Sequence, residues 1–213
     1  MPVDMKSLIG NTFEEMMEYK SIDKITIKDL VDACNISRQA FYYHFRDIMD
    51  VVKYKFEKDM RTVLANSLNT SSLEEALQIF ILKIGKRKTI IQKQVISQRK
   101  EEIAVIALEV VNKYLQELFR KKVLKKKISY EELDVIVDFY SCGITTFLLK
   151  QYEKEQVDEK KLAIELNKRQ ELINNLKDEE LKSFKEAYNT EKIYEYDEKI
   201  KIKLKRNGSI RNN

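Results

Sequence analysis

Proline and glycine are almost absent from this chain, which has one proline and four glycines among its 213 residues. Because these two residues form turns and interrupt helices, their scarcity favours few turns and long helices. No stretch approaches the roughly 18 apolar residues that a membrane-spanning helix needs. The opening MPVDMKSLIG also lacks the apolar core of a secretory signal. The sequence therefore predicts a cytoplasmic, all-α protein without a membrane partner.

Groups that carry catalytic or metal chemistry are scarce as well. The chain has a single histidine, His44, and two cysteines, Cys34 and Cys142, that lie far apart in helical, apolar patterns. We interpret both cysteines as small buried apolar residues in a reducing compartment. No nucleophile–base pair, phosphate-binding loop or ligand cluster at metal spacing is visible. We therefore expect no enzyme activity, no catalytic residue, no metal site and no cofactor.

Charge, by contrast, is abundant and unevenly distributed. The chain has 40 basic and 35 acidic residues, which gives a net charge of +5. Residues 1–60 hold 9 basic and 11 acidic side chains, whereas residues 83–127 hold 14 basic and 4 acidic ones. The basic segment is open to three interpretations: a solvated face, a site for an anionic effector or partner, or an auxiliary nucleic-acid contact. DNA binding within the acidic segment would depend on a few well-placed cations.

Apolar residues recur at three- and four-residue spacing along most of the chain, which predicts successive amphipathic helices. The first covers residues 5–17, and the clearest covers residues 103–118. Ser129 and Glu132 form a capping box that opens a further helix ending near Tyr152. Together these segments predict an all-helical body behind the N-terminal region.

Polar residues mark the helix ends in the N-terminal region. Thr26 is expected to cap one helix, with Asp29 as its capping-box partner. Asn35 tolerates a left-handed backbone, so it ends that helix and turns the chain sharply. Ser37 then caps a helix of about seven residues, and Asp47 caps a longer fourth helix.

The stretch IKDLVDACNISRQAFYYHF, residues 27–45, thus contains two short helices joined through Asn35, the geometry of a helix-turn-helix. In that motif the first turn of the second helix enters the major groove of DNA. Arg38 at this place suits guanine and Gln39 suits adenine. Tyrosine hydroxyls and an imidazole N–H suit phosphate oxygens, which fix the register without reading sequence. The outward-facing residues are predicted to be Ser37, Arg38, Gln39, Tyr42 and Tyr43.

The aromatic residues at 41–45 have both structural and DNA-binding interpretations. Phe41 is expected to face the core, together with Ala40. For Tyr43 and Phe45 a place in the core is the stronger interpretation, and DNA contact is the alternative. His44 is either a phosphate contact or a structural histidine satisfied inside the fold.

The longer stretch ITIKDLVDACNISRQAFYYHFRDIMDVV resembles the DNA-binding head of the TetR family of bacterial regulators, and the resemblance covers residues 5–60. It departs in having Asn35 where the family has glycine, and Asp47 near the place of a common lysine. Arg46 or Lys53 would then supply that phosphate contact. The matching residues are Thr26, Leu30, Ala33, Ser37, Phe41, Tyr42, His44 and Phe45. The DNA-binding residues that the resemblance and the residue types together predict are Thr26, Ser37, Arg38, Gln39, Tyr42, Tyr43 and His44.

Residues 133–152, LDVIVDFYSCGITTFLLKQY, are similar to the dimerising eighth helix of a TetR subgroup that includes regulators of dihydroxyacetone-kinase operons. The resemblance implies that this helix and the next pair with their copies in a four-helix dimer interface. The small residues at its centre leave a second interpretation open, a close helix crossing inside one subunit. The interface residues are predicted to be Phe139, Gly143, Thr146 and Phe147.

These observations predict three segments: a helix-turn-helix head at 1–50, a regulatory and dimerisation body at 51–176, and a charged extension at 177–213. Within the extension, IYEYDEKIKIKLKRNG alternates with period two, which indicates a small hairpin or edge strand. Disorder is the alternative, and residues 205–213 are expected to be disordered.

The family resemblance implies a homodimer that binds double-stranded operator DNA, acts as a repressor and is released by a small-molecule effector. The alternative is a helical adaptor or co-regulator that works through a protein partner and does not read DNA. The acidic balance of residues 1–60 favours the adaptor, whereas the pair Arg38 and Gln39 favours the DNA reader.

Overall fold

The computed structural model describes residues 4–122 and 130–154, together with the single positions 158, 161, 164, 165 and 168. Within these residues the chain forms eight α-helices and one short 3-10 helix, and no strand. The predicted all-α fold is confirmed. The described helices all lie within one compact unit, Met1–Glu165. The predicted hairpin and the Ser129 cap lie outside the described residues.

The head is built from three α-helices, each starting at a polar cap, with a 3-10 helix after the first. These elements are α1 (Met5–Tyr19), η1 (Ile22–Lys24), α2 (Ile27–Cys34) and α3 (Arg38–His44). Thr26 and Asp29 form the predicted capping box, in which the Thr26 Oγ1 accepts from the Asp29 N–H at 3.1 Å. The Ser37 hydroxyl accepts from the Ala40 N–H at 3.0 Å. These local bonds satisfy N–H groups that a helix start leaves without partners.

Asn35 makes the turn between α2 and α3. It has φ 52° and ψ 49°, the left-handed region, and no other non-glycine residue in the described ranges has a positive φ. Its N–H donates to the Asp32 carbonyl at 3.2 Å, and the next N–H, of Ile36, donates to the Val31 carbonyl at 3.0 Å. The turn satisfies carbonyls at the end of α2 and sets the start of α3, as predicted.

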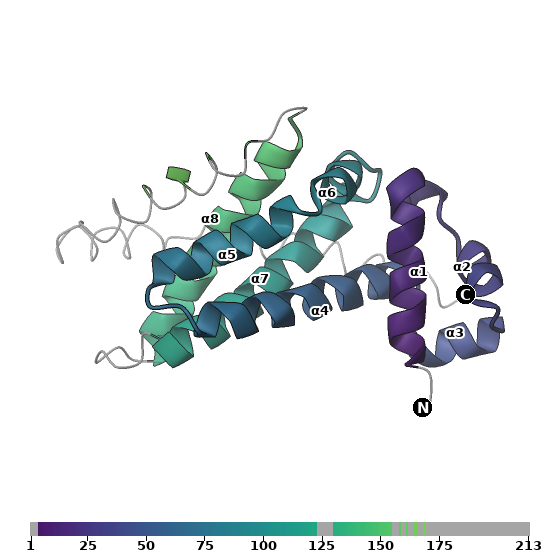
Figure 1. Ribbon diagram of the computed structural model, residues 1–213, viewed down its shortest axis with the longest axis horizontal. Coiled ribbons are helices and arrows are strands. Elements are labelled where there is room, and N and C mark those ends of the chain that lie inside the picture. The colour runs from purple at the N-terminus through teal and green to yellow at the C-terminus, as the bar shows by residue number, and fades with distance from the viewer. Residues whose placement is uncertain are drawn as a thin grey trace. The chain divides into compact units, whose positions relative to one another are not determined.

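The body begins with a long helix that leaves the head. Its helices are α4 (Ile48–Leu68), α5 (Leu73–Gly85), α6 (Lys88–Val95), α7 (Lys100–Lys122) and α8 (Tyr130–Tyr152). Figure 1 shows α4 running from its contact with α1 into the body, where it packs against α5 and α7. The α7 helix packs in turn against α8. At about 1.5 Å per residue, the 21 residues of α4 give one rigid element about 30 Å long shared by head and body.

Head and body share one apolar core. The buried cluster that holds Phe41, Phe45 and Leu30 of the head also includes Ile90 of α6 and Ile103 of α7. Full burial of such a side chain contributes about 1.5–3 kcal/mol. The two cysteines are only half-buried, so their burial is smaller than predicted. For Cys34 the reason is its position at the last residue of α2, beside the turn.

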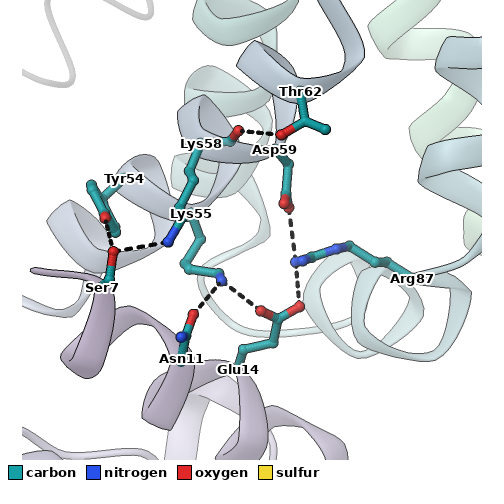
Figure 2. Close-up of polar contacts among 9 residues, drawn as sticks. All are labelled: Ser7, Asn11, Glu14, Tyr54, Lys55, Lys58, Asp59, Thr62 and Arg87. Atoms are coloured by element: carbon teal, nitrogen blue, oxygen red, sulfur yellow. Dashed lines mark hydrogen bonds and ion pairs between the residues drawn. The ribbon is translucent and has the colours of Figure 1, made fainter. Parts of the chain in front are cut away.

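Ion pairs also join head and body, as Figure 2 shows. The Glu14 carboxylate on α1 contacts the Lys55 Nζ at 2.6 Å and the Arg87 Nη1 at 2.5 Å. Arg87, between α5 and α6, contacts the Asp59 carboxylate of α4 at 2.8 Å. Because Lys55 is 6 % exposed, its charge is withdrawn from water and needs these partners. The network fastens α1 to the body.

Candidate nucleic-acid interface

The α3 helix presents a polar face at its first turn and an apolar face to the core. The side chains of Arg38 and Gln39 are exposed and form no hydrogen bond or ion pair with any residue the structure describes. Phe41 is 0 % exposed, and Tyr42, next to it, is 55 % exposed. Ser37 is exposed as well. The predicted division of α3 into an inner and an outer face is confirmed at these positions.

Tyr43 does not lie in the core, so the structure selects the second of its two interpretations, the outer face. Its side chain is 84 % exposed, whereas Phe45 is 4 % exposed and buried as predicted. Phe41 and Phe45, four residues apart, occupy the buried stripe of this short helix with ring centroids 5.9 Å apart. Tyr43 lies two residues from each of them, so it points away from the core. Both tyrosines of α3 are therefore on the outer face.

His44 is the last residue of α3 and is half-buried. Its ring packs edge-to-face against Tyr43, with centroids 4.9 Å apart. No group of three or more metal-ligating side chains occurs among the described residues. The contact leaves the structural and the phosphate-contact interpretations of His44 both open.

Thr26 is more engaged than the other candidate contacts. Its hydroxyl donates to the Asp29 Oδ2 at 2.9 Å, and its backbone N–H donates to the same oxygen at 2.9 Å. These bonds from Thr26 lower the pKa of Asp29. A cation, Lys20, lies 3.5 Å from the Asp29 carboxylate. The start of α2 thus already holds the Asp29 carboxylate, and a DNA phosphate that contacts Thr26 would have to approach this negative charge.

The two cations expected to replace the family's lysine are already paired. The Arg46 guanidinium donates to the Asp50 carboxylate at 2.8 and 2.9 Å, and this contact lowers the pKa of Asp50. The Lys53 Nζ contacts the Glu109 carboxylate of α7 at 2.5 Å. Lys24, Lys28 and Arg38 are exposed head cations that form no ion pair within the described part of the chain. The two lysines were not among the predicted contacts, although their place on short amphipathic elements was a usable signal.

The four predicted interface residues lie on α8 at spacings of four, three and one. Gly143 and Thr146 are exposed, and Phe139 and Phe147 are half-buried. A Cβ placed on Gly143 would meet no atom within 4 Å. In the described part of one subunit, therefore, no helix crosses closely at Gly143. The small residue that does face a neighbouring helix is Ser141, whose hydroxyl accepts from the Asn112 amide of α7 at 3.2 Å.

A cavity lies between α1 of the head and five helices of the body, α4 to α8. The space in it that is open to the centres of water molecules is about 130 Å³. Its walls are mainly aliphatic and include Met17 of α1, Val52 of α4 and Ile91 of α6. Within the described ranges, no helix combines the length and apolarity that crossing a membrane would require.

A helix-turn-helix head joined by a long helix to an all-α body is the arrangement of TetR-type folds. No family model and no curated protein matches the sequence. Among solved structures, the dihydroxyacetone kinase operon activator DhaS is similar at 17 % identity and a TM-score of 0.56, over 78 % of this chain and 94 % of that one. The repressor AlkX from Dietzia sp. strain DQ12-45-1b is similar at 15 % identity and a TM-score of 0.52, over 78 % and 92 % of the two chains.

A transcriptional regulator from Aquifex aeolicus VF5 is also similar, at 16 % identity and a TM-score of 0.50, over 79 % of this chain and 98 % of that one. At these identities the likeness establishes the fold. This chain has the fold of the TetR family, which confirms the resemblance that the helix-turn-helix residues indicated.

Proposed function

We propose that this protein is a dimeric transcriptional regulator that reads operator DNA through α3, acts as a repressor and is released by a small ligand. One observation carries the proposal: the exposed first turn of α3, where Arg38 and Gln39 have no partner among the described residues. Side chains with hydrogen-bonding groups exposed next to a rigid turn are typical of a recognition helix. A regulator of this kind would work in the cytoplasm, where the chromosome is.

Each residue of the interface has a separate role in the proposal. Arg38 would read guanine and Gln39 adenine in the major groove. Tyr42 and Tyr43 would donate their hydroxyls to phosphate oxygens, which positions the helix without reading sequence. The Ser37 hydroxyl accepts from Ala40 and keeps its own hydrogen for a phosphate.

Two further candidate contacts carry less weight. The Thr26 hydroxyl already donates to Asp29, so a contact with phosphate requires it to exchange partners. His44 is half-buried against Tyr43, which limits its reach. We propose both as contacts at the edge of the interface.

The dimer in this proposal forms through the face of α8 that carries Phe139, Gly143, Thr146 and Phe147. The exposure of Gly143 and the empty space around it support an approach by a second chain. A two-fold axis would place two α3 helices in successive major grooves, about 34–36 Å apart, on a pseudo-palindromic site. Changing Gly143 to leucine should dissociate the dimer in sedimentation velocity. Asp134→Leu, which places the same side chain at an exposed position of α8 outside that face, should stay dimeric. A Gly143→Leu variant that is still a dimer would move the interface elsewhere.

Ligand control is the finer part of the proposal. The cavity touches both α1 and the body, so a molecule bound there would favour one arrangement of the head over another. Among the similar structures AlkX is described as a repressor and DhaS as an activator. We propose repression because a dimer seated on promoter DNA excludes polymerase directly.

A second candidate function is a helical adaptor that acts through a protein partner. The ion pairs of Arg46 and Lys53 favour it, because they remove two cations from phosphate binding. The acidic balance of residues 1–60 adds to this. The two functions differ in one respect that is easily measured, namely affinity for DNA.

Fluorescence anisotropy at physiological salt tests the proposal. The full chain is titrated into DNA from upstream of its own gene and into a scrambled duplex. We expect preferential binding to the first DNA, lost in the double variant Arg38→Ala, Gln39→Ala. Arg61→Ala, an exposed cation of α4 that has no ion pair with described residues, is the matched control and should bind normally. Absence of binding to either DNA would favour the adaptor, whose partner a pull-down would then identify.

A further inference from the structure

The cavity between head and body is built for an apolar ligand. Its open space of about 130 Å³ is roughly ten times the 10–15 Å³ that one water molecule needs. The residues around it are mostly valine, isoleucine, leucine, methionine and phenylalanine, with Phe13, Phe56 and Leu148 on three different helices. Apolar walls give water few hydrogen-bond partners, so such a space favours an apolar occupant.

A buried hydroxyl in the wall, that of Thr145, has no hydrogen-bond partner in the described part of the chain. Thr145 of α8 is 6 % exposed, and its Oγ1 makes no hydrogen bond there. A buried hydroxyl in this state is costly to the folded protein. Because Thr145 lines the cavity, an oxygen atom on a ligand would satisfy it. The occupant is therefore expected to be apolar but not a pure hydrocarbon.

The charged side chains of the wall determine the preferred charge of that ligand. Both carboxylates, of Glu14 and Asp59, are held by Lys55 and Arg87, as Figure 2 shows. The remaining cation is Lys83 of α5, which also lines the cavity. No carboxylate of the described residues lies at ion-pair distance from its amine. The wall thus carries three cations and two anions, and the unmatched charge is positive.

We propose that this cavity binds a predominantly apolar molecule with a single negative charge, of the class of aliphatic carboxylates. The carboxylate pairs with Lys83 and also accepts a hydrogen bond from the Thr145 hydroxyl, one through each oxygen, while the chain lies among the aliphatic walls. A cationic ligand of the same length would add a second unmatched positive charge. A neutral one would leave Lys83 without a partner.

The position of the cavity gives the ligand a direct effect on the head. Phe13, Glu14 and Met17 of α1 form part of its wall. The α6 helix, which also lines it, is tied to the end of α1, because the Lys93 Nζ donates to the Met17 carbonyl at 2.8 Å and to the Glu18 carbonyl. A ligand that displaces either helix changes the placement of α1. This regulatory step rests on the proposed function, whereas binding itself does not.

Calorimetry on the full chain without DNA tests the binding. Decanoate, decan-1-ol and decylamine share one chain length and differ in the charge of the head group. We expect decanoate to saturate one site per chain and to bind about tenfold or more tightly than the alcohol, since a charged hydrogen bond is roughly twice as strong as a neutral one. Decylamine should bind most weakly. Lys83→Met should remove the preference for decanoate, and the isosteric Thr145→Val should weaken decanoate severalfold.

Lys86→Met is the matched control, because Lys86 is exposed, lies three residues from Lys83 and is not part of the wall. It should leave all three affinities unchanged. Absence of saturable binding, tighter binding of decylamine, or equal effects of the Lys83 and Lys86 variants would overturn the proposal. An unchanged affinity in Thr145→Val would remove Thr145 from the site. Fluorescence anisotropy of the DNA complex with added decanoate then tests regulation separately. If the protein without ligand failed to bind DNA, the proposed function would be overturned, whereas the calorimetric result for decanoate would stand.

Discussion

Tyr43 allows fold stability and DNA binding to be separated within one short helix. Its side chain is 84 % exposed, and its ring contact is with the adjacent His44. Phe41, two residues away on the same helix, is 0 % exposed. Replacing each residue by alanine removes an aromatic ring from α3, once from the outer face and once from the core.

The expected magnitudes follow from the two exposures. An aromatic side chain of about 200 Å² that is 84 % exposed withdraws only about 30 Å² from water, worth about 0.8 kcal/mol at most. Phe41→Ala removes a fully buried ring and leaves a cavity, which should cost about 3–5 kcal/mol. If Tyr43 donates to a phosphate, its loss should cost about 1.5–3 kcal/mol of binding, or about ten- to hundredfold in Kd.

Urea denaturation and fluorescence anisotropy on the same two proteins provide the test. Tyr43→Ala should unfold within about 1 kcal/mol of the parent and lose affinity for operator and scrambled DNA to the same degree. Phe41→Ala should instead show a large loss in the free energy of unfolding. A Tyr43→Ala protein destabilised by more than about 2 kcal/mol would refute the assignment of this side chain to the outer face. Unchanged DNA affinity would refute its role as a phosphate contact.

Three further predictions concern stability. Asn35→Ala should cost about 1 kcal/mol, because alanine resists the left-handed backbone, while Asn35→Gly should cost nothing by urea denaturation. The Arg46 guanidinium lowers the pKa of Asp50. The contribution of Asp50 to the free energy of unfolding is therefore fully present above pH 3.8 and is lost as the pH falls through the lowered pKa. Asp50→Asn should accordingly reduce the loss of stability at acid pH. Burial raises the pKa of Tyr114 from 10.0 to about 12. The stability that the neutral Tyr114 contributes below pH 10 is therefore lost as the pH rises from 10 to about 12. Tyr114→Phe should lose this slope in alkaline denaturation, and an unchanged slope would assign it to other groups.

Caps and turns of the head followed from the sequence because their bonds join residues three or four positions apart. Thr26 with Asp29, Ser37 with Ala40 and the left-handed Asn35 are examples. A side chain that bonds to a backbone group within one turn needs no tertiary contact to select it. The same locality made the order of aromatic residues in α3 a usable sign of the TetR fold.

Partners far away in the sequence were not predictable in this way. Lys53 was one of two candidates for a phosphate contact, and it contacts Glu109, which lies 56 residues further along the chain. For Tyr43 the core was the stronger interpretation and the outer face the alternative, and the one buried stripe of α3 is filled by Phe41 and the cap residue Phe45. In both cases the packing of neighbouring elements decided between two placements that the local pattern allowed.

The sequence alone thus determined the helical class, the helix ends of the head and the residue types at the outer face of α3, because these depend on interactions within one or two turns. The cavity, its unmatched Lys83 and the ion pairs that fasten α1 to the body were decided by tertiary structure. Their residues come from helices separated by tens of positions, and only the assembly of α1 and α4 to α8 around one cavity brings them to one place. Charge balance and burial at such a site are sums over non-local neighbours, so no local pattern in the chain encodes them.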